Sequence, residues 1–334
     1  MKIDFSHRQF AHCESGVTAN LLNHHGFSCS EAMVFGIGGG LFFGYVPFVK
    51  INFMPLTTFR TSPGSIFAKA TKRLGVEVKR EKFRDPVAAE KKLDLLLEAG
   101  CPVGAQTGVF WLPFFPPAYR FHFNGHNLVV IGKEGDDYLI SDPIFEEMVR
   151  CPAADLRKAR FAKGALAPKG KIYYIEKIPD QFDLPQAVKA GIREVCRGML
   201  KTPIPLAGVR GIRYLARQLA KWPIKLGEKQ TLLYLGHVIR MQEEIGTGGG
   251  GFRFLYAAFL EEAAGVLEND RLLELSHHCT EIGDLWRDFA LLASRVCKGR
   301  VAIQDSFDEL AQLLNRCADE EEILFNALLM ATKK

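Results

Sequence analysis

The sequence predicts an α+β domain followed by a mostly α-helical second domain, and the length and patterning of the chain are the basis of this prediction. At about 150 residues per domain, 334 residues correspond to two domains, and a hydrophobic content of 48% is ample for two cores. Short apolar runs and turn residues precede residues 179–185, whereas helical periodicity continues after them. We therefore expect one domain over residues 1–180 and another over residues 181–334.

The first domain is expected to contain two helices and a set of short strands. Apolar spacing predicts helices over residues 13–24 and 86–99, and a glycine-rich turn that leads into a strand over residues 36–51. Several glycines and Pro47 interrupt the longest uncharged stretch, residues 32–49, which argues against a membrane-spanning helix. Further strands, each next to turn residues, are expected at residues 103–111, 127–131, 138–141 and 171–175.

The second domain is expected to be a helical bundle. Apolar residues recur at positions i, i+3, i+4 and i+7 in a series of segments, and this spacing places them on one face of a helix. Asp183, with Pro185 after it, and the pair Asn269-Asp270 are suitable helix starts. The segments are residues 183–199, 209–221, 229–244, 252–267, 270–296 and 305–330.

Cys13 and His126 have the placement of a cysteine nucleophile and its base. Cys13 begins the first predicted helix, where the partial positive charge of a helix N-terminus favours a thiolate over a thiol. His126 follows Gly125 and opens a predicted strand far along the chain. Papain-like enzymes combine a cysteine at a helix start with a histidine that is distant in sequence, and we therefore expect a papain-like fold for the first domain.

Asp142 is the expected third member of this group. Residues 132–136 join the predicted strands 127–131 and 138–141, and this pairing places Asp142 opposite His126 in an antiparallel hairpin. Opposed residues of such a hairpin share a face, with Cβ atoms roughly 5 Å apart. Asp142 is therefore predicted to hold the imidazole of His126 in the tautomer that a base requires.

Motifs along most of the chain resemble the butirosin biosynthesis protein H family. Those of the first domain include His12-Cys13-Glu14-Ser15, His25-Gly26, residues 30–36, Gly38-Gly39-Gly40, Gly125-His126-Asn127 and Ser141-Asp142-Pro143. Those of the second domain are the glycine-rich residues 246–250 with Arg253, Tyr256 and Phe259-Leu260.

This resemblance implies a C39-peptidase-like fold that is used as an acyltransferase. The family's namesake moves an aminoacyl group from the pantetheine thioester of a carrier protein to an amine of an aminoglycoside. Carried over by position, Cys13 would be the nucleophile, His126 the base and Asp142 the orienting acid. The implied partners are an acidic acyl carrier protein, whose phosphopantetheine arm is the donor in place of a bound cofactor, and a small-molecule amine of specialised metabolism, as in antibiotic biosynthesis.

The resemblance leaves open which side chain completes the oxyanion hole. One donor would be the backbone N–H of Cys13 at the helix start, and loss of such a donor typically costs about 3 kcal/mol of transition-state stabilisation. In papain-like and C39-like enzymes a Gln lies six residues before the nucleophile and supplies the second donor. Here that position is His7 and the nearest Gln is Gln9, so both side chains are candidates.

Other residues have both a structural and a functional interpretation. Glu31 is either a buried hydrogen-bonding anchor or a contact to the substrate. A basic stripe of Arg210, Arg213, Arg217 and Lys221 recurs at helical spacing, and is either a solvated face or a dock for an acidic carrier protein. The glycine-rich residues 246–251 are either a flexible connector or a lid whose Arg253 reaches the active site. No metal site is expected, because the neighbours His277 and His278 would point in different directions on a helix.

Charge and cysteine content constrain partners and compartment. Residues 157–229 carry 17 Lys or Arg and 5 Asp or Glu, a net charge of +12, whereas residues 241–334 carry 9 and 17, a net charge of −8. The basic segment lacks the motifs of a nucleic-acid-binding protein but suits an acidic partner. Without an apolar signal core or a CxxC pair, the chain is expected to be cytoplasmic, with free thiols and no membrane partner. The sequence leaves the choice between a monomer and a homo-oligomer open.

The sequence therefore predicts a cysteine acyltransferase that forms an amide through an acyl-cysteine. A cysteine amidase or peptidase would use the same three residues with water as the acceptor. A non-catalytic binding protein on the same fold is the third alternative, and the filled positions 13, 126 and 142 disfavour it.

Overall fold

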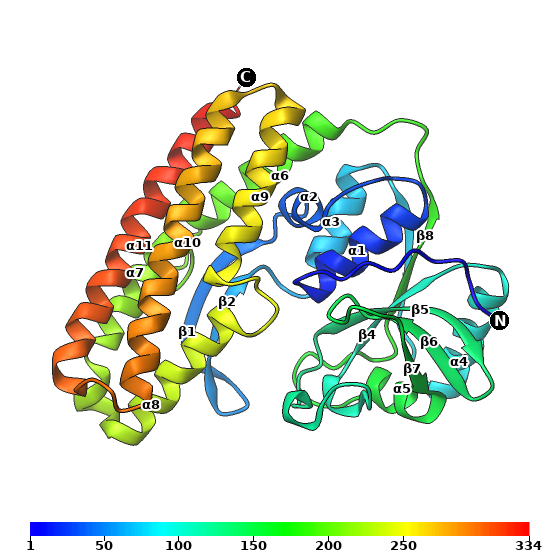
Figure 1. The fold of residues 1–334 in the computed structure, drawn as a ribbon, viewed down its shortest axis with the longest axis horizontal. Helices are drawn as coiled ribbons and strands as arrows, with labels where there is room; N and C mark the ends of the chain where they lie inside the picture. The colour runs from blue at the N-terminus through cyan, green and yellow to red at the C-terminus, as the bar shows by residue number, and fades with distance from the viewer. Residues whose placement is uncertain (334) are drawn as a thin grey trace. The chain divides into compact units, whose positions relative to one another are not determined.

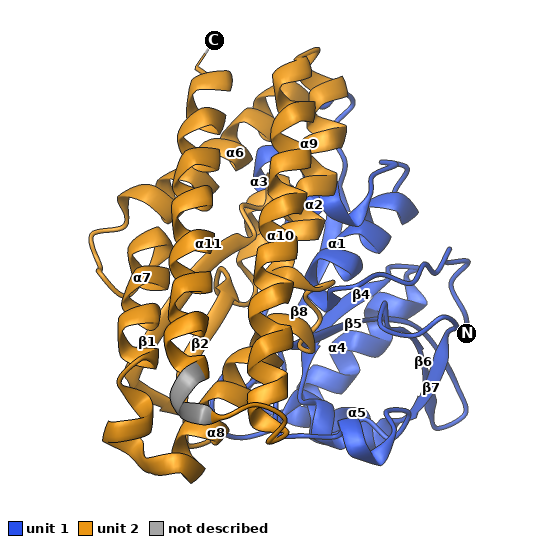
Figure 2. Cartoon of the chain, turned by 60° about the vertical axis from the view of Figure 1, so that its left-hand side comes forward, with its two compact units in different colours: residues 1–34, 71–182 blue, residues 35–70, 183–334 orange. Residues whose placement is uncertain are grey.

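A computed structural model describes residues 1–333 of the chain, without the side chains of residues 303–305, and shows two compact units. Unit 1 comprises residues 1–34 and 71–182, and unit 2 comprises residues 35–70 and 183–334 (Figure 2). The α+β fold class is as predicted: unit 1 mixes helices with a sheet, and the C-terminal part of the chain is helical. Residues 35–70, however, belong to unit 2 and not to the first domain in which the sequence analysis placed them.

Unit 1 is built on a six-stranded antiparallel sheet (Figure 1). The alternation of side chains along its strands gives the sheet two distinct faces. Leu128, Val130 and Ile140 belong to the core that also contains Leu93 and Leu156 of two helices, α4 (Pro86–Glu98) and α5 (Ala153–Arg160). In spatial order the strands are β3 (Glu77–Glu81), β8 (Ile172–Lys177), β4 (Val103–Thr107), β5 (His126–Glu134), β6 (Asp137–Ser141) and β7 (Val149–Pro152).

The β5–β6 hairpin differs from its predicted register. The strands run further toward the turn than expected, so that Glu134 pairs with Asp137 across Gly135-Asp136. After an irregularity between Val130 and Gly132, Val129 pairs with Ser141. If this register continued by one more pair, Asp142 would lie opposite Leu128 and not opposite His126. Asp142 nevertheless stays on the face of His126, because a shift of two residues preserves the alternation of side chains.

Unit 2 combines a two-stranded hairpin with a set of helices. Strands β1 (Leu41–Ile51) and β2 (Met54–Arg60) pair antiparallel and contact helices α7 and α8. Aromatic packing explains why these strands leave unit 1: Phe43 and Phe59 contact each other and the ring of Trp286. The helices are α6 (Leu184–Lys201), α7 (Gly208–Leu219), α8 (Trp222–Glu243), α9 (Arg253–Leu267), α10 (Asp270–Cys297) and α11 (Ile303–Ala331).

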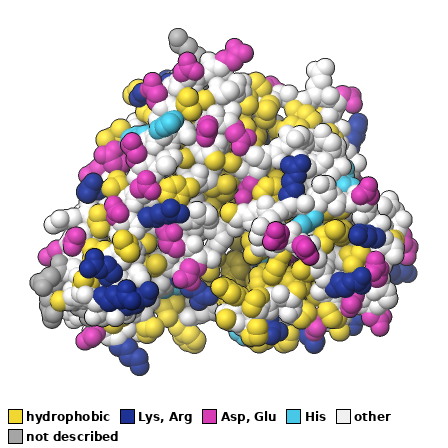
Figure 3. Space-filling view, in the orientation of Figure 1, with side chains coloured by type: hydrophobic (Ala, Val, Ile, Leu, Met, Phe, Trp, Pro, Cys, Tyr) yellow, Lys and Arg dark blue, Asp and Glu magenta, His cyan; other side chains and the backbone are white. Residues whose placement is uncertain are grey.

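Local signals fixed the helix starts that the sequence analysis singled out. The side chain of Asp183 accepts a hydrogen bond from the backbone of Gln186 at the start of α6, and Asn269 accepts one from Arg271 at the start of α10. Figure 3 shows acidic side chains gathered over the upper part of the helical unit and basic side chains lower down, toward α8. Among the described residues, no helix has both the length and the apolar character needed to cross a membrane.

The glycine-rich segment before α9 is packed, which corrects the expectation of a flexible connector or lid. The backbone N–H of Gly250 donates to Glu243, and a Cβ atom on Gly251 would lie 2.3 Å from the ring of Phe59. Arg253 is only 1% exposed and donates to Glu321, a fully buried carboxylate, at 2.8 Å. This guanidinium is therefore part of the interior of unit 2 and is not a surface arm that contacts substrate.

Candidate active site

Cys13 is the first residue of α1 (Cys13–His24), which has the bounds that the sequence predicts. His12 is the N-cap residue in an extended conformation, and its Nδ1 accepts a hydrogen bond from the backbone N–H of Ser15 at 3.3 Å. The side chain of Cys13 is thereby placed at the positive end of the helix dipole, where a thiolate is favoured. Cys13 is buried, with 8% of its surface exposed.

Glu31 anchors the segment that carries Cys13. It begins the helix α2 (Glu31–Ile37), and its carboxylate accepts hydrogen bonds from the backbone N–H groups of Ala11 and His12, at 2.9 and 2.8 Å, and from the hydroxyl of Ser15 at 2.9 Å. Burial raises the pKa of Glu31, and these three donors oppose that rise. Of its two interpretations, the contacts match the hydrogen-bonding anchor, because the carboxylate is occupied by the residues around the nucleophile.

The first turn of α1 lies directly against the segment that contains Asp142. The backbone N–H of Phe10 donates to the carbonyl of Pro143 at 2.7 Å. A Cβ atom on Gly16 would lie 2.8 Å from the side chains of both Phe10 and Pro143, so only glycine allows this approach. Gly16 therefore helps to bring the hairpin end to the nucleophile.

His126 and Asp142 form a buried pair beside Cys13. Nε2 of His126 lies 2.6 Å from Oδ2 of Asp142, and the other carboxylate oxygen accepts the backbone N–H of Ile144 at 3.1 Å. Since Nε2 faces Asp142, Nδ1 is the ring nitrogen left to interact with Cys13, whose proximity contributes to the raised pKa of His126. The ring of Phe115 packs edge-on against the imidazole, with centroids 5.3 Å apart. The structure thus brings the three predicted residues together.

The electrostatics of the site favour a protonated His126. Burial alone lowers the pKa of this imidazole, but the charge of Asp142, its hydrogen bond and the contact with Cys13 together outweigh burial and raise the pKa to about 10. The imidazolium is therefore the main form of His126 at neutral pH. An imidazolium next to the sulfur stabilises a thiolate, the form of cysteine that attacks carbonyl groups.

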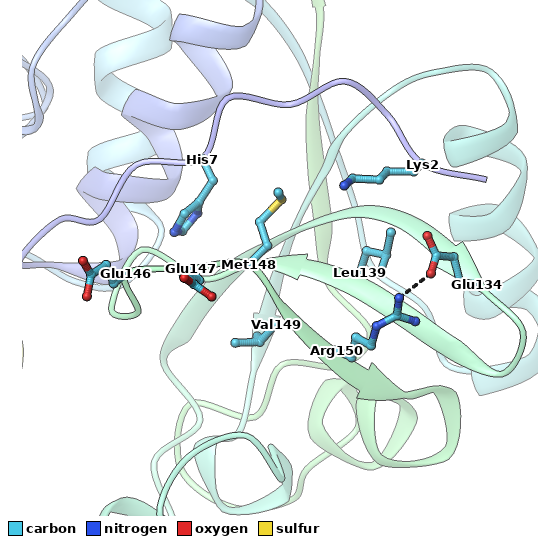
Figure 4. A pocket seen from close by; sticks show the side chains of 9 residues that line it. All are labelled: Lys2, His7, Glu134, Leu139, Glu146, Glu147, Met148, Val149 and Arg150. Carbon is cyan, nitrogen blue, oxygen red and sulfur yellow. Dashed lines mark hydrogen bonds and ion pairs between the residues drawn. The ribbon is translucent and has the colours of Figure 1, made fainter.

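His7 and Gln9, the two predicted oxyanion donors, do not point to Cys13. Nδ1 of His7 bonds the hydroxyl of Ser141 at 2.7 Å and Nε2 bonds the carbonyl of Phe145 at 3.1 Å, while the amide of Gln9 donates to the carbonyl of Ile144. His7 lines an open pocket of about 460 Å³ together with Lys2, Glu134 and Arg150 (Figure 4). The residues that line this pocket do not include Cys13, His126 or Asp142. The structure therefore supports neither side chain as the second donor.

Two other side chains that the sequence analysis did not single out lie at the nucleophile. Nδ2 of Asn127 donates to Sγ of Cys13 at 3.9 Å, and the hydroxyl of Tyr173 donates to Oδ1 of Asn127 at 2.9 Å. Alternation along β5 gave no signal for Asn127, since it places Asn127 on the face opposite to both Leu128 and His126.

The basic stripe consists of three residues of α7 and of Lys221, which follows that helix, and it is only partly exposed. Arg213 is paired with Asp319 and Glu322 of α11, at 2.7 and 2.6 Å, so its charge is used within unit 2. Arg210 donates to the carbonyl of Thr202 but is exposed, as are Arg217 and Lys221. Three of the four predicted cations therefore face solvent.

Comparisons with known proteins identify two families that the chain matches. Residues 12–143 match the family model described as butirosin biosynthesis protein H, N-terminal, and residues 154–328 match the family model described as a domain of unknown function, DUF4872. No curated protein matches the chain. A solved structure described as a C39-like peptidase from Bacillus anthracis matches with a TM-score of 0.38 and 16% identity, over 54% of this chain and 100% of that one.

The first family match contains Cys13, His126 and Asp142, and the second covers more than half of the chain. The arrangement of the three residues, with a cysteine at a helix start and a His–Asp pair on a sheet, is that of a papain-like cysteine enzyme. The chain therefore belongs to the DUF4872 family, and its residues 12–143 match the N-terminal domain of butirosin biosynthesis protein H.

Proposed function

We propose that this protein is an acyltransferase that moves an acyl or aminoacyl group from a carrier-protein thioester, through an acyl-Cys13 intermediate, to an amine of a small molecule. The observation that carries the proposal is the group of Cys13, His126 and Asp142 within the segment that matches the butirosin biosynthesis protein H family. The family's name supports a role in specialised metabolism, and the buried imidazolium–sulfur contact supports covalent catalysis by cysteine.

The first half-reaction exchanges one thioester for another. The Cys13 thiolate attacks the carbonyl carbon of the donor thioester, and a tetrahedral oxyanion forms. When this intermediate collapses, the bond between the carbonyl carbon and the pantetheine sulfur breaks, and the imidazolium of His126 gives its proton to the departing thiolate. The exchange is nearly isoenergetic because a thioester bond is broken and another is formed. The backbone N–H of Cys13, at the start of α1, is a donor for the oxyanion.

The second half-reaction uses His126 as a base. The acceptor amine attacks the acyl-Cys13 carbonyl, its nitrogen gives a proton to His126, and the bond between carbon and Sγ breaks to regenerate the thiolate. Cys13 is neutral while it is acylated, so the contribution of the sulfur to the raised pKa of His126 is absent at this stage. The neutral, proton-accepting form of His126 is thereby favoured when the amine arrives.

The proposed donor is the phosphopantetheine arm of an acidic carrier protein, and the exposed cations Arg210, Arg217 and Lys221 are the proposed dock. The proposed compartment is the cytoplasm. Hydrolysis of an amide or peptide by the same three residues is the competing reaction, since the acceptor alone distinguishes it from transfer.

Loading and discharge of Cys13 test this function. Incubation with an aminoacyl carrier protein should increase the mass of the intact protein by that of the aminoacyl group, and Cys13→Ala should abolish the increase. Cys29→Ala, which removes a half-buried thiol of unit 1, is the matched control and should load normally. A suitable amine should then discharge the acyl-enzyme faster than water does.

Failure has two distinguishable forms. Loading of Cys13 followed by release of free acid alone, at a rate that none of a panel of amines increases, would identify a hydrolase. A protein that forms no adduct with either carrier-bound or free thioesters, while it keeps its fold, would contradict the cysteine enzyme and favour a binding protein.

A further inference from the structure

Asn127 is held in one orientation beside the nucleophile. The side chain is 3% exposed, and its two amide hydrogens are directed to Sγ of Cys13, at 3.9 Å, and to the carbonyl of Gly125, at 3.1 Å. Its oxygen accepts the hydroxyl of Tyr173 at 2.9 Å. A flipped amide would lose this hydrogen bond from Tyr173 and would set Oδ1 against the carbonyl of Gly125, so that two acceptors would face each other. Tyr173 therefore directs an N–H group of Asn127 toward the sulfur.

Tyr173 reaches Asn127 across an intervening strand. Gly104 of β4 pairs with Tyr173 of β8 on one side and with Val129 of β5 on the other. A Cβ atom on Gly104 would lie 2.2 Å from Cε2 of Tyr173, so the ring lies directly over the glycine. Because Gly104 has no side chain, the ring of Tyr173 can cross β4, and its hydroxyl can bond to the amide of Asn127 on β5.

We propose that Asn127 is a catalytic residue that donates a hydrogen bond to the Cys13 thiolate, and that Tyr173 is a positioning residue that orients it. The proposal rests on Cys13 being the nucleophile of the proposed function. A hydrogen bond to sulfur is stronger when the sulfur is charged, so this contact stabilises the thiolate of the free enzyme. The same contact stabilises the thiolate that leaves when an acceptor discharges acyl-Cys13.

Two substitutions separate the roles of the donor and its positioner. Asn127→Leu keeps a similar side-chain volume without the N–H group, and Tyr173→Phe removes only the hydroxyl. The rate of Cys13 alkylation by iodoacetamide, measured by peptide mass spectrometry from pH 5 to pH 10, reports the thiolate fraction. We expect the rate at pH 7 to fall roughly tenfold or more in Asn127→Leu, as for loss of a hydrogen bond to a charged group, and by a smaller factor in Tyr173→Phe. Both profiles should shift toward higher pH.

Tyr174→Phe is the matched control, because the hydroxyl of Tyr174 donates to Glu81 and belongs to the next residue of the same strand. It should keep the wild-type profile. Circular dichroism and the melting temperature identify variants that fail to fold. If Asn127→Leu unfolds, the conclusion depends on Tyr173→Phe, which removes one hydroxyl and leaves Oδ1 of Asn127 without this donor.

The outcomes separate this proposal from the proposed function. If Cys13 of the wild-type protein is not alkylated in preference to the other thiols, the nucleophile assignment fails and the role of Asn127 fails with it. If the wild type reacts but the folded Asn127→Leu and Tyr173→Phe variants keep its alkylation profile, the thiolate contact is overturned while the function stands. In that case, a loss confined to acylation by a thioester would assign the amide to the oxyanion instead.

Discussion

Nε2 of His126 and Oδ2 of Asp142 lie 2.6 Å apart, although the two residues are not opposed in the β5–β6 hairpin. Asp142 follows β6 directly, and its second oxygen accepts the backbone N–H of Ile144, which fixes the carboxylate in an Asx turn. The carboxylate is fully buried, so the charge of an imidazolium is its main electrostatic partner. This pair determines which ring nitrogen of His126 faces the sulfur.

Asp142→Asn should keep the fold and lower turnover by about 10⁴-fold, because an amide in this position orients the imidazole poorly and does not stabilise its charged form. Steady-state transfer kinetics, or single-turnover acylation of Cys13, measure the effect. Asp136→Asn, in the turn of the same hairpin and exposed to solvent, should have normal kinetics. Near-normal turnover of Asp142→Asn would exclude Asp142 as the partner of the base.

Cys13 should be the first thiol alkylated at pH 6.5. Desolvation raises the pKa of six other thiols: to about 12 for Cys151 and Cys196, and in the same direction for Cys101, Cys279, Cys297 and Cys317. Thiols of raised pKa react slowly near neutral pH because little thiolate is present. Labelling with a substoichiometric amount of iodoacetamide, followed by peptide mapping, measures the order. Preferential labelling of Cys29, with Cys13 inert, would contradict the nucleophile assignment.

The stability of the protein should fall between pH 6.5 and about 10 through His126. Its pKa is about 10 in the folded state, against about 6.5 for an unperturbed histidine, so folding takes up a proton at this residue. The resulting stabilisation is present in full below pH 6.5 and is lost as the pH rises through the folded pKa. Urea unfolding of the wild type and of His126→Gln at pH 6, 8 and 10 measures this contribution.

The free energy of unfolding of the wild type should exceed that of His126→Gln by the largest margin at pH 6 and by a smaller margin at pH 10. His122→Gln, at an exposed position of the same unit, is the control and should give no such trend. A difference between the wild type and His126→Gln that is independent of pH would show that His126 is not protonated in the folded protein.

The sequence predicts elements well where local signals decide them. Helix α1 begins at Cys13 and ends at His24, as expected from its apolar spacing, and Asp183 caps α6. The hairpin residues are brought together despite the register error, because a shift of two residues keeps Asp142 on the face of His126. Alternation is a property of the strand, whereas the exact pairing depends on the turn and on the irregularity near Val130.

The features that the sequence analysis missed depend on contacts between distant residues. Residues 35–70 join the helical unit because Phe43 and Phe59 pack on Trp286, more than two hundred residues away. The spacing typical of papain-like enzymes predicts His7 and Gln9 as oxyanion donors, but their side chains bond to residues 141–145. Asn127 lies at the sulfur and accepts the hydroxyl of Tyr173 from across Gly104, an arrangement that spacing within one segment does not encode.

Reversing the exposed charges of the basic stripe should slow transfer from a carrier-bound donor and should leave transfer from a free thioester unaffected. Because Arg213 is paired with Asp319 and Glu322 in unit 2, its reversal would damage the fold, and the useful positions are Arg217 and Lys221. Reversing both to Glu should slow transfer from a carrier-bound donor, mainly through the association rate, and leave transfer from a free thioester unchanged. Arg295→Glu with Lys298→Glu makes the same charge change at exposed positions of α10 and the residue that follows it, and should have no such effect.

Salt provides a second criterion for the dock, since exposed charges are screened over about 8 Å at physiological ionic strength. The wild type and the Arg217→Glu/Lys221→Glu variant should therefore converge in rate as salt is raised, because screening removes the attraction in one and the repulsion in the other. Equal losses with carrier-bound and free donors would show that the substitutions damaged unit 2. If the wild type and the variant have equal rates with both donors at low salt, these cations do not contribute to docking and are an ordinary solvated helix face. The carrier protein would then have to bind elsewhere.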